Sequence, residues 1–332
     1  MSSLVLKRQR RLMKAVQLPE LSGPEALQVI DTDIPEPPAG CVVVEVHTAG
    51  VTFPELLQTR GMYQTKHQVP FVIGSEGAGT VHAVGKGADF QVGDRVAFIT
   101  DKGAWAQYAV APATHTVKLP DEVDFEAAAG MPMNVLTADF ALRHRGKLQA
   151  GQSVLIHGAA GGLGSALVQV ALAMEAEVIA VVSTEEKAAI VKELGAQHVV
   201  LADGFKDRVK EIKPRGVDLV ADPVGGDRFT DSLRCLATYG TLLVLGFTAG
   251  GIPEVKVNRL LLNNISVAGV GWGAATVPNP GLIQEQWQTL LPHVKAGKLN
   301  PRIHATFPLE NASAALAELD NRTVMGKILL TP

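Results

Sequence analysis

Short apolar runs alternate with longer helix-forming segments through the middle of the chain. The apolar runs are rich in β-branched residues and lie at 153–157, 178–183, 198–201, 218–222, 241–246 and 266–270. The segments between them have helical composition and lie at 163–174, 185–194, 205–212, 228–236 and 256–262. Because a crossover segment separates each apolar run from the next, this pattern predicts an α/β fold with a doubly wound parallel sheet.

The preceding part of the chain has a different pattern, with β-rich runs separated by glycine and proline. These runs lie at 14–18, 27–33, 41–50, 77–85, 94–99 and 105–110, and they predict a compact β domain. Helical segments are expected at 125–131 and 135–145 as a connector. The C-terminal pattern is mixed, with helices at 282–295 and 311–321 and strands at 303–307 and 327–330, which indicates a return to the first domain.

These patterns predict three parts of the chain. Residues 1–12 are expected to be a disordered extension, because the strand pattern begins only at Lys14. A β-rich catalytic domain is expected to comprise residues 13–137 and 277–332. The doubly wound domain is expected at residues 138–276, and its motifs predict that it binds a dinucleotide.

The first strand of the predicted sheet runs directly into a glycine-rich turn and a helix. Residues 153–171 read SVLIHGAAGGLGSALVQVA, which matches the dinucleotide pattern G-x-G-x-x-G except at its first position. The first N–H groups of a helix have no partner within it and lie at the positive end of its dipole, so they accommodate a pyrophosphate. A packing turn without a ligand is the alternative. The expected cofactor-binding residues here are Ala159, Gly161, Gly162, Leu163 and Gly164.

The end of the second strand indicates which dinucleotide is bound. An NAD site usually has an acidic residue there to hold the ribose hydroxyls, and this chain has Ser183. Lys187 is close enough in sequence to reach a 2′-phosphate, although an exposed surface lysine is the alternative reading. The nearby Glu186 would repel a phosphate, but Ser183 and Glu186 also match a helix capping box, which would occupy that carboxylate. Ser183 and Lys187 therefore favour NADPH over NADH.

Composition excludes several classes of partner. The 332 residues are 47% hydrophobic and 19% charged with a net charge of −3, so no basic surplus favours nucleic acid. The two cysteines, Cys41 and Cys235, lie far apart, which indicates a reducing compartment and a cytoplasmic location. The basic cluster at residues 7–11 lacks the apolar core of a secretory signal, and no membrane span is expected because no uninterrupted apolar run reaches about 18 residues.

Several motifs together resemble the medium-chain dehydrogenase/reductase superfamily, and within it the zinc-independent quinone oxidoreductases. The resemblance extends from Lys14 to Pro332. It rests on AGVTFPELLQTRGMY (49–63), PFVIGSEGAGTVHAVG (70–85), VGDRVA (92–97), the glycine turn, STEEKAA (183–189), DPVGGD (222–227) and GKILL (326–330). It implies a GroES-like catalytic domain, a Rossmann domain, and hydride transfer from NADPH to a quinone or α,β-unsaturated carbonyl held between the domains.

The resemblance also implies that no metal takes part. Zinc alcohol dehydrogenases of the superfamily have a cysteine at the position of Thr52 and a metal-binding histidine at the position of Ser75. Hydroxyl side chains have no useful affinity for zinc, and the four-cysteine lobe that binds structural zinc is missing. The nine histidines form no close pair with another histidine or cysteine in the sequence. A zinc dehydrogenase is thus a less favoured alternative.

Particular site residues follow from the resemblance. It places Thr52 and Tyr63 on the substrate side as candidate catalytic residues, with the Tyr63 phenol a possible proton donor and rim packing the alternative. Thr137 corresponds to a threonine beside the nicotinamide in relatives. The remaining correspondences are Gly246 and Phe247, in the loop that faces the nicotinamide, and Lys327, near the cofactor phosphates.

The chain departs from some relatives at the adenosine end of the predicted site. Ala202 and Asp203 stand where several relatives have a tyrosine and an arginine that help to hold the 2′-phosphate. A carboxylate at this point predicts weaker binding of NADPH than in those relatives.

The resemblance leaves related functions open and implies a dimer. An enoyl-thioester reductase of the same superfamily is one alternative, and a non-catalytic NADPH-binding sensor or structural protein is another. In this family, subunits commonly pair through the last Rossmann strand, so a homodimer is expected to form through residues 265–270.

Overall fold

The computed structural model describes residues 11–332, which form two compact units. Unit 1 comprises residues 11–121, 305–322 and 328–332, and unit 2 comprises residues 122–304 and 323–327. Unit 1 contains two sheets and unit 2 contains one, and each unit is described separately below.

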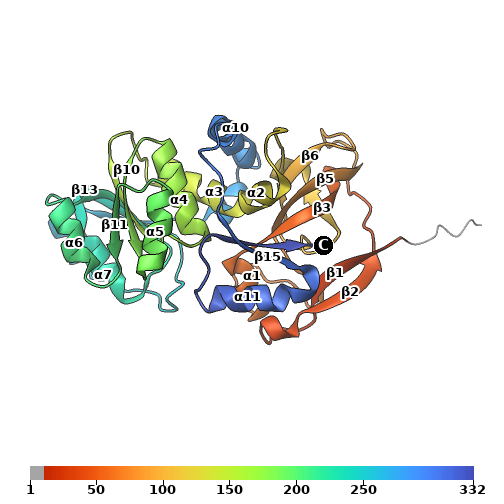
Figure 1. The fold of residues 1–332 in the computed structure, drawn as a ribbon, viewed down its shortest axis with the longest axis horizontal. Helices are drawn as coiled ribbons and strands as arrows, with labels where there is room; N and C mark the ends of the chain where they lie inside the picture. Colours follow the sequence, from red (N-terminus) through yellow and green to blue (C-terminus); the bar gives the residue numbers. More distant parts are fainter. Residues whose placement is uncertain (1–10) are drawn as a thin grey trace, which may run out of the picture. The chain divides into compact units, whose positions relative to one another are not determined.

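Unit 2 is built on a six-stranded parallel sheet (Figure 1). Its strand order is β11-β10-β9-β12-β13-β14, so the chain moves outward on one side of β9 and then on the other. The strands are β9 (Ser153–His157), β10 (Glu177–Val182), β11 (His198–Leu201), β12 (Val217–Asp222), β13 (Leu236–Val244) and β14 (Ser266–Gly269). All six predicted strands are present and the predicted doubly wound fold is confirmed. Ligands of such folds bind outside the carboxyl ends of the strands, where the order reverses.

Helices cover both faces of this sheet because right-handed crossovers change face where the strand order reverses. Helices α4 (Gly162–Ala173) and α5 (Glu185–Glu193) lie on one face, and α6 (Phe205–Ile212) and α7 (Phe229–Arg234) lie on the other (Figure 1). On the second face, Leu155 and Val220 of the sheet pack with Phe205 and Leu233 of the helices. The short α8 (Asn258–Asn263) precedes the edge strand β14.

Four further helices belong to unit 2: α2 (Phe125–Gly130), α3 (Pro132–Asp139), α9 (Trp272–Thr276) and α10 (Leu282–Lys295). α3 starts at Pro132, three residues earlier than predicted, because proline is well suited to the first turn of a helix; its continuation, Phe140–Arg145, is a π-helical turn. The Gln286 amide of α10 donates to the Leu136 carbonyl oxygen at 2.8 Å. This packing groups α2, α3 and α10 with unit 2, whereas the predicted domain boundaries lie at 137/138 and 276/277.

Unit 1 is the β-rich part of the chain. Its sheets have the orders β2-β1-β4 and β15-β16-β3-β5-β6-β8, and β7 also pairs with β3. The strands are β1 (Leu12–Leu18), β2 (Gln28–Asp33), β3 (Cys41–Val51), β4 (Phe71–Val72), β5 (Glu76–Val84), β6 (Arg95–Ile99), β7 (Tyr108–Pro112), β8 (Thr116–Lys118), β15 (Ile303–Pro308) and β16 (Lys327–Thr331), and the helices are α1 (Phe53–Thr59) and α11 (Ala312–Asp320). The six predicted strands of this region are present. The short β4, β8 and α1 were not predicted.

The N-terminal boundary of the first strand differs from the expectation. Strand β1 begins at Leu12, which pairs with Asp33 of β2, so the strand starts two residues before Lys14. The predicted extension of residues 1–12 is therefore wrong at Leu12, because backbone pairing with β2 orders this residue. Arg11 precedes the strand, and its carbonyl oxygen accepts from the Ile34 N–H at 3.0 Å, whereas residues 1–10 lie outside the described residues.

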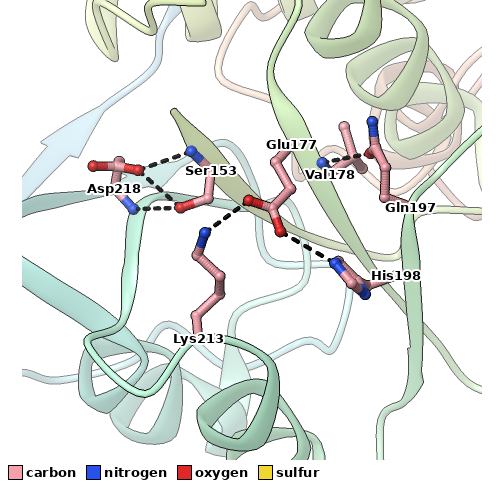
Figure 2. Close-up of polar contacts among 7 residues, drawn as sticks. All are labelled: Ser153, Glu177, Val178, Gln197, His198, Lys213 and Asp218. Atoms are coloured by element: carbon pink, nitrogen blue, oxygen red, sulfur yellow. Dashed lines mark hydrogen bonds and ion pairs between the residues drawn. The ribbon is translucent and has the colours of Figure 1, made fainter. Parts of the chain in front are cut away.

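A polar network joins the amino ends of the parallel strands, at the edge of the sheet opposite the glycine turn (Figure 2). The Glu177 carboxylate accepts from the Lys213 ammonium at 2.7 Å and contacts the His198 imidazole at 3.1 Å. Asp218 accepts from both the backbone N–H and the hydroxyl of Ser153, each at 2.8 Å. These contacts tie β9 to β12, and β10 to β11 and to the end of α6, away from any predicted ligand.

The Glu177→Gln variant should be less stable than the native protein by about 1 kcal/mol at pH 7, because an amide forms a weaker bond with Lys213. The hydrogen bond from Lys213 lowers the pKa of the Glu177 carboxyl below its ordinary value of 4.5. A lowered folded-state pKa stabilises the protein above the unfolded-state pKa, and that contribution disappears as the pH falls through the folded-state value. Urea unfolding at several pH values would measure this. Glu193→Gln, an exposed change of the same kind on α5, is the control and should change stability little.

Candidate functional site

The glycine turn after β9 lies at the carboxyl edge of the sheet, where its backbone requires glycine for two reasons. Gly158 has a φ of +60°, a conformation that residues with side chains rarely adopt. A Cβ atom at Gly164 would lie only 2.0 Å from the Gly158 carbonyl oxygen. Gly164 therefore lets the first turn of α4 pack directly against the end of β9.

Gly161 has a different role in the turn. It is the N-cap of α4, and it has no side chain to accept from the N–H groups of the first helical turn. A Cβ atom at Gly161 would meet nothing closer than the Gly158 carbonyl oxygen, at 3.5 Å, which is an ordinary contact. Packing within the chain does not require glycine here, so the open space and the uncapped N–H groups suit an anionic ligand that approaches the backbone closely.

The segment before β16 lies beside the turn. Gly326 forms a parallel bridge with Gly161, and its N–H donates to the Ala160 carbonyl oxygen at 2.8 Å. Lys327 follows directly and is buried, with 2% of its surface exposed. The structure therefore brings Lys327 next to the turn near which the sequence placed it, whereas its contact with phosphate stays a prediction.

Helix α3 also contacts the turn. A Cβ atom at Gly162 would lie 2.8 Å from the Asn134 side-chain nitrogen, so Asn134 borders the start of α4. Thr137 lies three residues further on, on the same side of α3, and is partly exposed. Thr137 is among the residues predicted from the sequence, whereas Asn134 is not. The spacing of three residues within a helix was the signal that could have found it.

Two loops at the carboxyl edge of the sheet are joined by backbone hydrogen bonds. The Leu245 N–H donates to the Asp222 carbonyl oxygen at 3.0 Å, and the Thr248 N–H donates to that of Pro223 at 3.2 Å. These bonds hold the residues between them, Gly246 and Phe247, against the loop that follows β12. Phe247 is 37% exposed, so an apolar ring faces solvent beside these backbones.

The predicted 2′-phosphate site at the end of β10 differs in one detail from the expectation. The N-cap of α5 is Thr184, whose hydroxyl accepts from the Lys187 N–H at 3.2 Å. The predicted Ser183–Glu186 capping box is therefore wrong, because the helix starts one residue later, and the exposed Ser183 hydroxyl lies outside the cap. Lys187 is partly buried, and burial lowers the pKa of its ammonium while Glu186 opposes this change.

Ala202 and Asp203 lie close to this place in the sheet. The Ala202 N–H donates to the Val182 carbonyl oxygen at 2.8 Å, at the ends of neighbouring parallel strands. Asp203 follows and is exposed. The negative charge that the sequence placed near the 2′-phosphate is thus at the same edge as Ser183.

In unit 1, the predicted catalytic residue Thr52 is the N-cap of α1. Its backbone N–H donates to Glu55 Oε2 at 2.8 Å, and its hydroxyl donates to the same oxygen in a capping box. Both residues are buried. The Thr52 hydroxyl therefore uses its only proton in the hydrogen bond to Glu55. Toward any other group, this hydroxyl can only accept a hydrogen bond.

The Glu55 carboxylate interacts electrostatically with the Tyr63 side chain. Burial raises the pKa of the Tyr63 phenol above its ordinary value of 10, and the Glu55 carboxylate raises it further. A small pocket beside the phenol is lined by Gln58, His67 and Phe71, among others. Glu55 and Gln58 were missed because α1 was not predicted, although their spacing of three residues places them on one face of a helix.

The described residues offer no cluster for a metal ion. Thr52 and Ser75, at the positions where the sequence argued against zinc ligands, are buried hydroxyl residues. Within residues 11–332, no group of three or more histidine, cysteine, aspartate or glutamate side chains is arranged to hold a metal. In the same range, no helix has both the length and the apolar character needed to cross a lipid bilayer.

Two family models match the chain, one in each half. The model described as "Alcohol dehydrogenase GroES-like domain" matches residues 38–121, and the one described as "Zinc-binding dehydrogenase" matches residues 162–296. Quinone oxidoreductase-like protein 2 of Mus musculus is 34% identical over 97% of this chain and 93% of its own length. Quinone oxidoreductase of Rattus norvegicus is 31% identical over 97% of this chain and 98% of its own length.

Solved structures of similar proteins cover almost the whole chain. A mycobacterial protein complexed with NADPH is 33% identical and superposes with a TM-score of 0.90, covering 96% of this chain and 100% of its own. Quinone oxidoreductase of Escherichia coli complexed with NADPH is 27% identical with a TM-score of 0.89, at the same coverage of both chains. The enoyl reductase CurK is 27% identical with a TM-score of 0.88, covering 96% of this chain and 99% of its own.

Proposed function

The chain belongs to the medium-chain dehydrogenase/reductase superfamily and, within it, to the quinone oxidoreductase family, and from this premise we propose that it reduces quinones or α,β-unsaturated carbonyl compounds with NADPH and without zinc. The observation that carries the proposal is the glycine turn at the carboxyl edge of a doubly wound sheet, with the uncapped start of α4 beside it. A redox cofactor supplies hydride chemistry of this kind, and the protein binds and orients the reactants.

The residues around the turn fit a dinucleotide phosphate. The first N–H groups of α4 and the open space at Gly161 receive the pyrophosphate. At the end of β10, Ser183 and Lys187 receive the 2′-phosphate through a hydroxyl and an ammonium. Thr137, Gly246 and Phe247 border the nicotinamide, and Lys327 lies on the phosphate side of the turn. When bound, NADPH supplies the hydride that reduces the substrate.

Tyr63 is the proton donor in this proposal. The phenol keeps its proton at neutral pH, since its ordinary pKa is 10 and burial raises it further, and it can donate a hydrogen bond or the proton to the oxygen of the reduced substrate. Thr52 borders the same site as a hydrogen-bond acceptor, because its hydroxyl already donates its proton in a hydrogen bond to Glu55. Gln58 extends the polar lining of the pocket beside the phenol.

The Tyr63→Phe variant should lower kcat by about 100-fold, the lower end of what general acid catalysis contributes, and should leave the Kd for NADPH unchanged. Steady-state kinetics and a binding titration would measure the two constants separately. Tyr108→Phe is the matched control, because Tyr108 is also a tyrosine of unit 1 with a raised pKa and packs against His82 on the sheet. A native kcat in Tyr63→Phe would show that Tyr63 is not the proton donor.

NADPH oxidation, followed by absorbance with a panel of quinones and enones, tests the proposed activity. Turnover of at least one of these classes is expected. Turnover of acyl-thioester substrates alone would identify an enoyl-thioester reductase instead, and tight NADPH binding without turnover of any substrate would favour a non-catalytic binding protein.

The proposed independence from zinc rests on the side chains that stand at the metal-ligand positions of the zinc alcohol dehydrogenases. Threonine and serine at positions 52 and 75 leave no thiolate or imidazole where the zinc alcohol dehydrogenases have their ligands. Metal analysis of the purified protein should give far less than one zinc per chain, and activity should survive a chelator. Stoichiometric zinc would overturn this part of the proposal.

A homodimer should form through β14. This strand is the last in the order of its sheet, and it pairs with β13 on one side. Leu261 and Leu262 of the preceding α8 are 76% and 74% exposed, so apolar side chains lie near the open edge. Gel filtration with light scattering should give twice the chain mass, and Leu261→Glu should shift the protein toward the monomer. A native monomer at micromolar concentration would contradict the dimer.

A further inference from the structure

Asp222 ends strand β12 and is buried, with 2% of its surface exposed. Its Oδ1 accepts from the N–H groups of Val224 and Gly225 at 2.8 and 2.9 Å, and so fixes the loop that follows the strand. Its Oδ2 is also buried, and no donor among the described residues is in hydrogen-bond contact with it. A buried carboxylate oxygen without a donor destabilises a protein, so a donor from a neighbouring group is expected.

That neighbour is His157, at the end of the adjacent strand β9. The register pairs Ala221 with Ile156, so Asp222 and His157 are the next residues on two parallel strands. Leu155 and Val220, two residues earlier on each strand, both face the side covered by α6 and α7. Because side chains alternate along a strand, His157 and Asp222 point to this same side.

The His157 ring lies in a closed environment. It packs edge-on against Phe205, its Nε2 lies 2.8 Å from the Ser232 hydroxyl, and its buried Nδ1 has no hydrogen-bond partner among the described residues. Burial lowers the pKa of His157 to about 4; Asp222 raises it and Arg228 lowers it further. The ring is therefore neutral at pH 7 and carries one N–H.

The position of that single proton decides whether the buried acceptors are satisfied. With the proton on Nε2, Nδ1 and Asp222 Oδ2 remain two buried acceptors without a donor. The Ser232 hydroxyl has one proton and lies within hydrogen-bond distance of two acceptors, the Arg228 carbonyl oxygen at 2.9 Å and Nε2 at 2.8 Å. With the proton on Nδ1, His157 donates toward Asp222, and the Ser232 hydroxyl donates to Nε2 instead of to Arg228. Ser232 is fully buried, so this order of side chains offers no nucleophile to a substrate.

Asp222 also connects this chain of side chains to the predicted nicotinamide site. Its carbonyl oxygen accepts from the Leu245 N–H at 3.0 Å, and the carbonyl oxygen of Val224 accepts from the Ala249 N–H at 2.9 Å. The backbone of Gly246 and Phe247 lies between these two bonds. A displacement of the loop at 222–225 would therefore displace the loop at 245–249.

We propose that Asp222 is a positioning residue for the cofactor, held by a hydrogen-bonded chain from Ser232 through Nδ1-protonated His157. The carboxylate fixes the loop after β12, and this loop fixes the backbone at Gly246 and Phe247. The inference rests on the proposed function, because it assumes that this backbone faces the nicotinamide.

Three variants of Asp222 distinguish its contacts with the loop from its contact with His157. The Kd for NADPH is measured for each variant. Asp222→Ala removes every side-chain contact and should raise the Kd at least about tenfold, the equivalent of one buried charged hydrogen bond. Asp222→Asn should stay within about threefold of the native Kd, because the amide oxygen still accepts from the loop and the amide N–H can donate to His157. Asp222→Ser should give an intermediate Kd, because its hydroxyl can hold the loop but is too short to reach His157.

Asp218→Ala is the matched control at the other end of β12 (Figure 2). It removes the hydrogen bonds with Ser153 at the amino edge of the sheet and should lower Tm while leaving the Kd within about twofold of native. A native Kd in Asp222→Ser, or an equal rise in Asp218→Ala, would overturn the inference even if Asp222→Ala fails to fold. If the native protein does not bind NADPH at all, it is the proposed function that fails.

Long-range ¹H–¹⁵N NMR of the protein without ligand tests the proton position directly. His157 should show a protonated Nδ1 and a bare Nε2 at neutral pH. In Asp222→Asn the proton should move to Nε2, because the new amide donates to Nδ1. A proton on Nε2 in the native protein would overturn the proposed hydrogen-bonded chain.

Discussion

Replacement of Gly164 by alanine should weaken NADPH binding by roughly 100-fold and lower Tm by several degrees. The new Cβ atom would lie 2.0 Å from the Gly158 carbonyl oxygen and 2.7 Å from the Ala159 Cα atom, and both are backbone atoms that cannot rotate away. Overpacking of this kind costs about 3 kcal/mol, which corresponds to a loss of affinity of roughly 100-fold if the turn opens to relieve it. Fluorescence titration with NADPH and thermal unfolding would measure the two effects.

Two other glycines are the controls for this prediction. A Cβ atom at Gly161 would make only an ordinary contact, so Gly161→Ala should keep the native Tm and yet bind NADPH more weakly, because the methyl group occupies space for the pyrophosphate. A Cβ atom at Gly273 would meet nothing within 4 Å, so Gly273→Ala should change neither quantity. Native NADPH affinity in both Gly161→Ala and Gly164→Ala would contradict a dinucleotide at this turn.

Replacement of Lys187 by alanine should reduce the preference for NADPH over NADH by about ten- to 100-fold. A charge-assisted hydrogen bond to the 2′-phosphate contributes about 1.5–3 kcal/mol, and the loss of the ammonium removes it from NADPH but not from NADH. The Kd for NADH should therefore stay close to its native value. Competitive titration with both cofactors would give the ratio.

The Lys192→Ala variant is the control for Lys187, since Lys192 is an exposed lysine in the last turn of the same helix. It removes the same charge at a greater distance from Ser183, so the cofactor ratio should not change. An equal loss of NADPH preference in both variants would show that the loss comes from the change in net charge and not from a contact made by Lys187. An unchanged ratio in Lys187→Ala would mean that the 2′-phosphate is held elsewhere or that the chain does not distinguish the two cofactors.

The doubly wound sheet was predictable because its signal is local. Each strand is a short apolar run, each helix has its own composition, and the bounds of α6 and α10 agree with the predicted ranges to the residue. Short elements were missed for the same reason. The seven residues of α1 contain proline and follow a long strand, so no periodic pattern identifies them as a helix.

The predictions for the candidate site also come from the sequence alone. The glycine turn, the residues Ser183 and Lys187 and the absence of metal ligands at Thr52 and Ser75 all depend on which residue stands at which position. The capping box was assigned one residue too early, because Ser183 and Thr184 both fit an N-cap and only the backbone conformation distinguishes them.

By itself, the sequence determined the type of fold, the turn for a dinucleotide and the family, because these depend on residue types at short spacings. The tertiary structure decided which distant segments meet. It placed Gly326 against Gly161, joined the loop at Asp222 to the one at Gly246, and set the hydrogen bond from the Thr52 hydroxyl to Glu55. These contacts depend on strand order, register and burial, which local patterns do not encode. For this reason, only the structure reveals the buried pair of His157 and Asp222 on neighbouring strands.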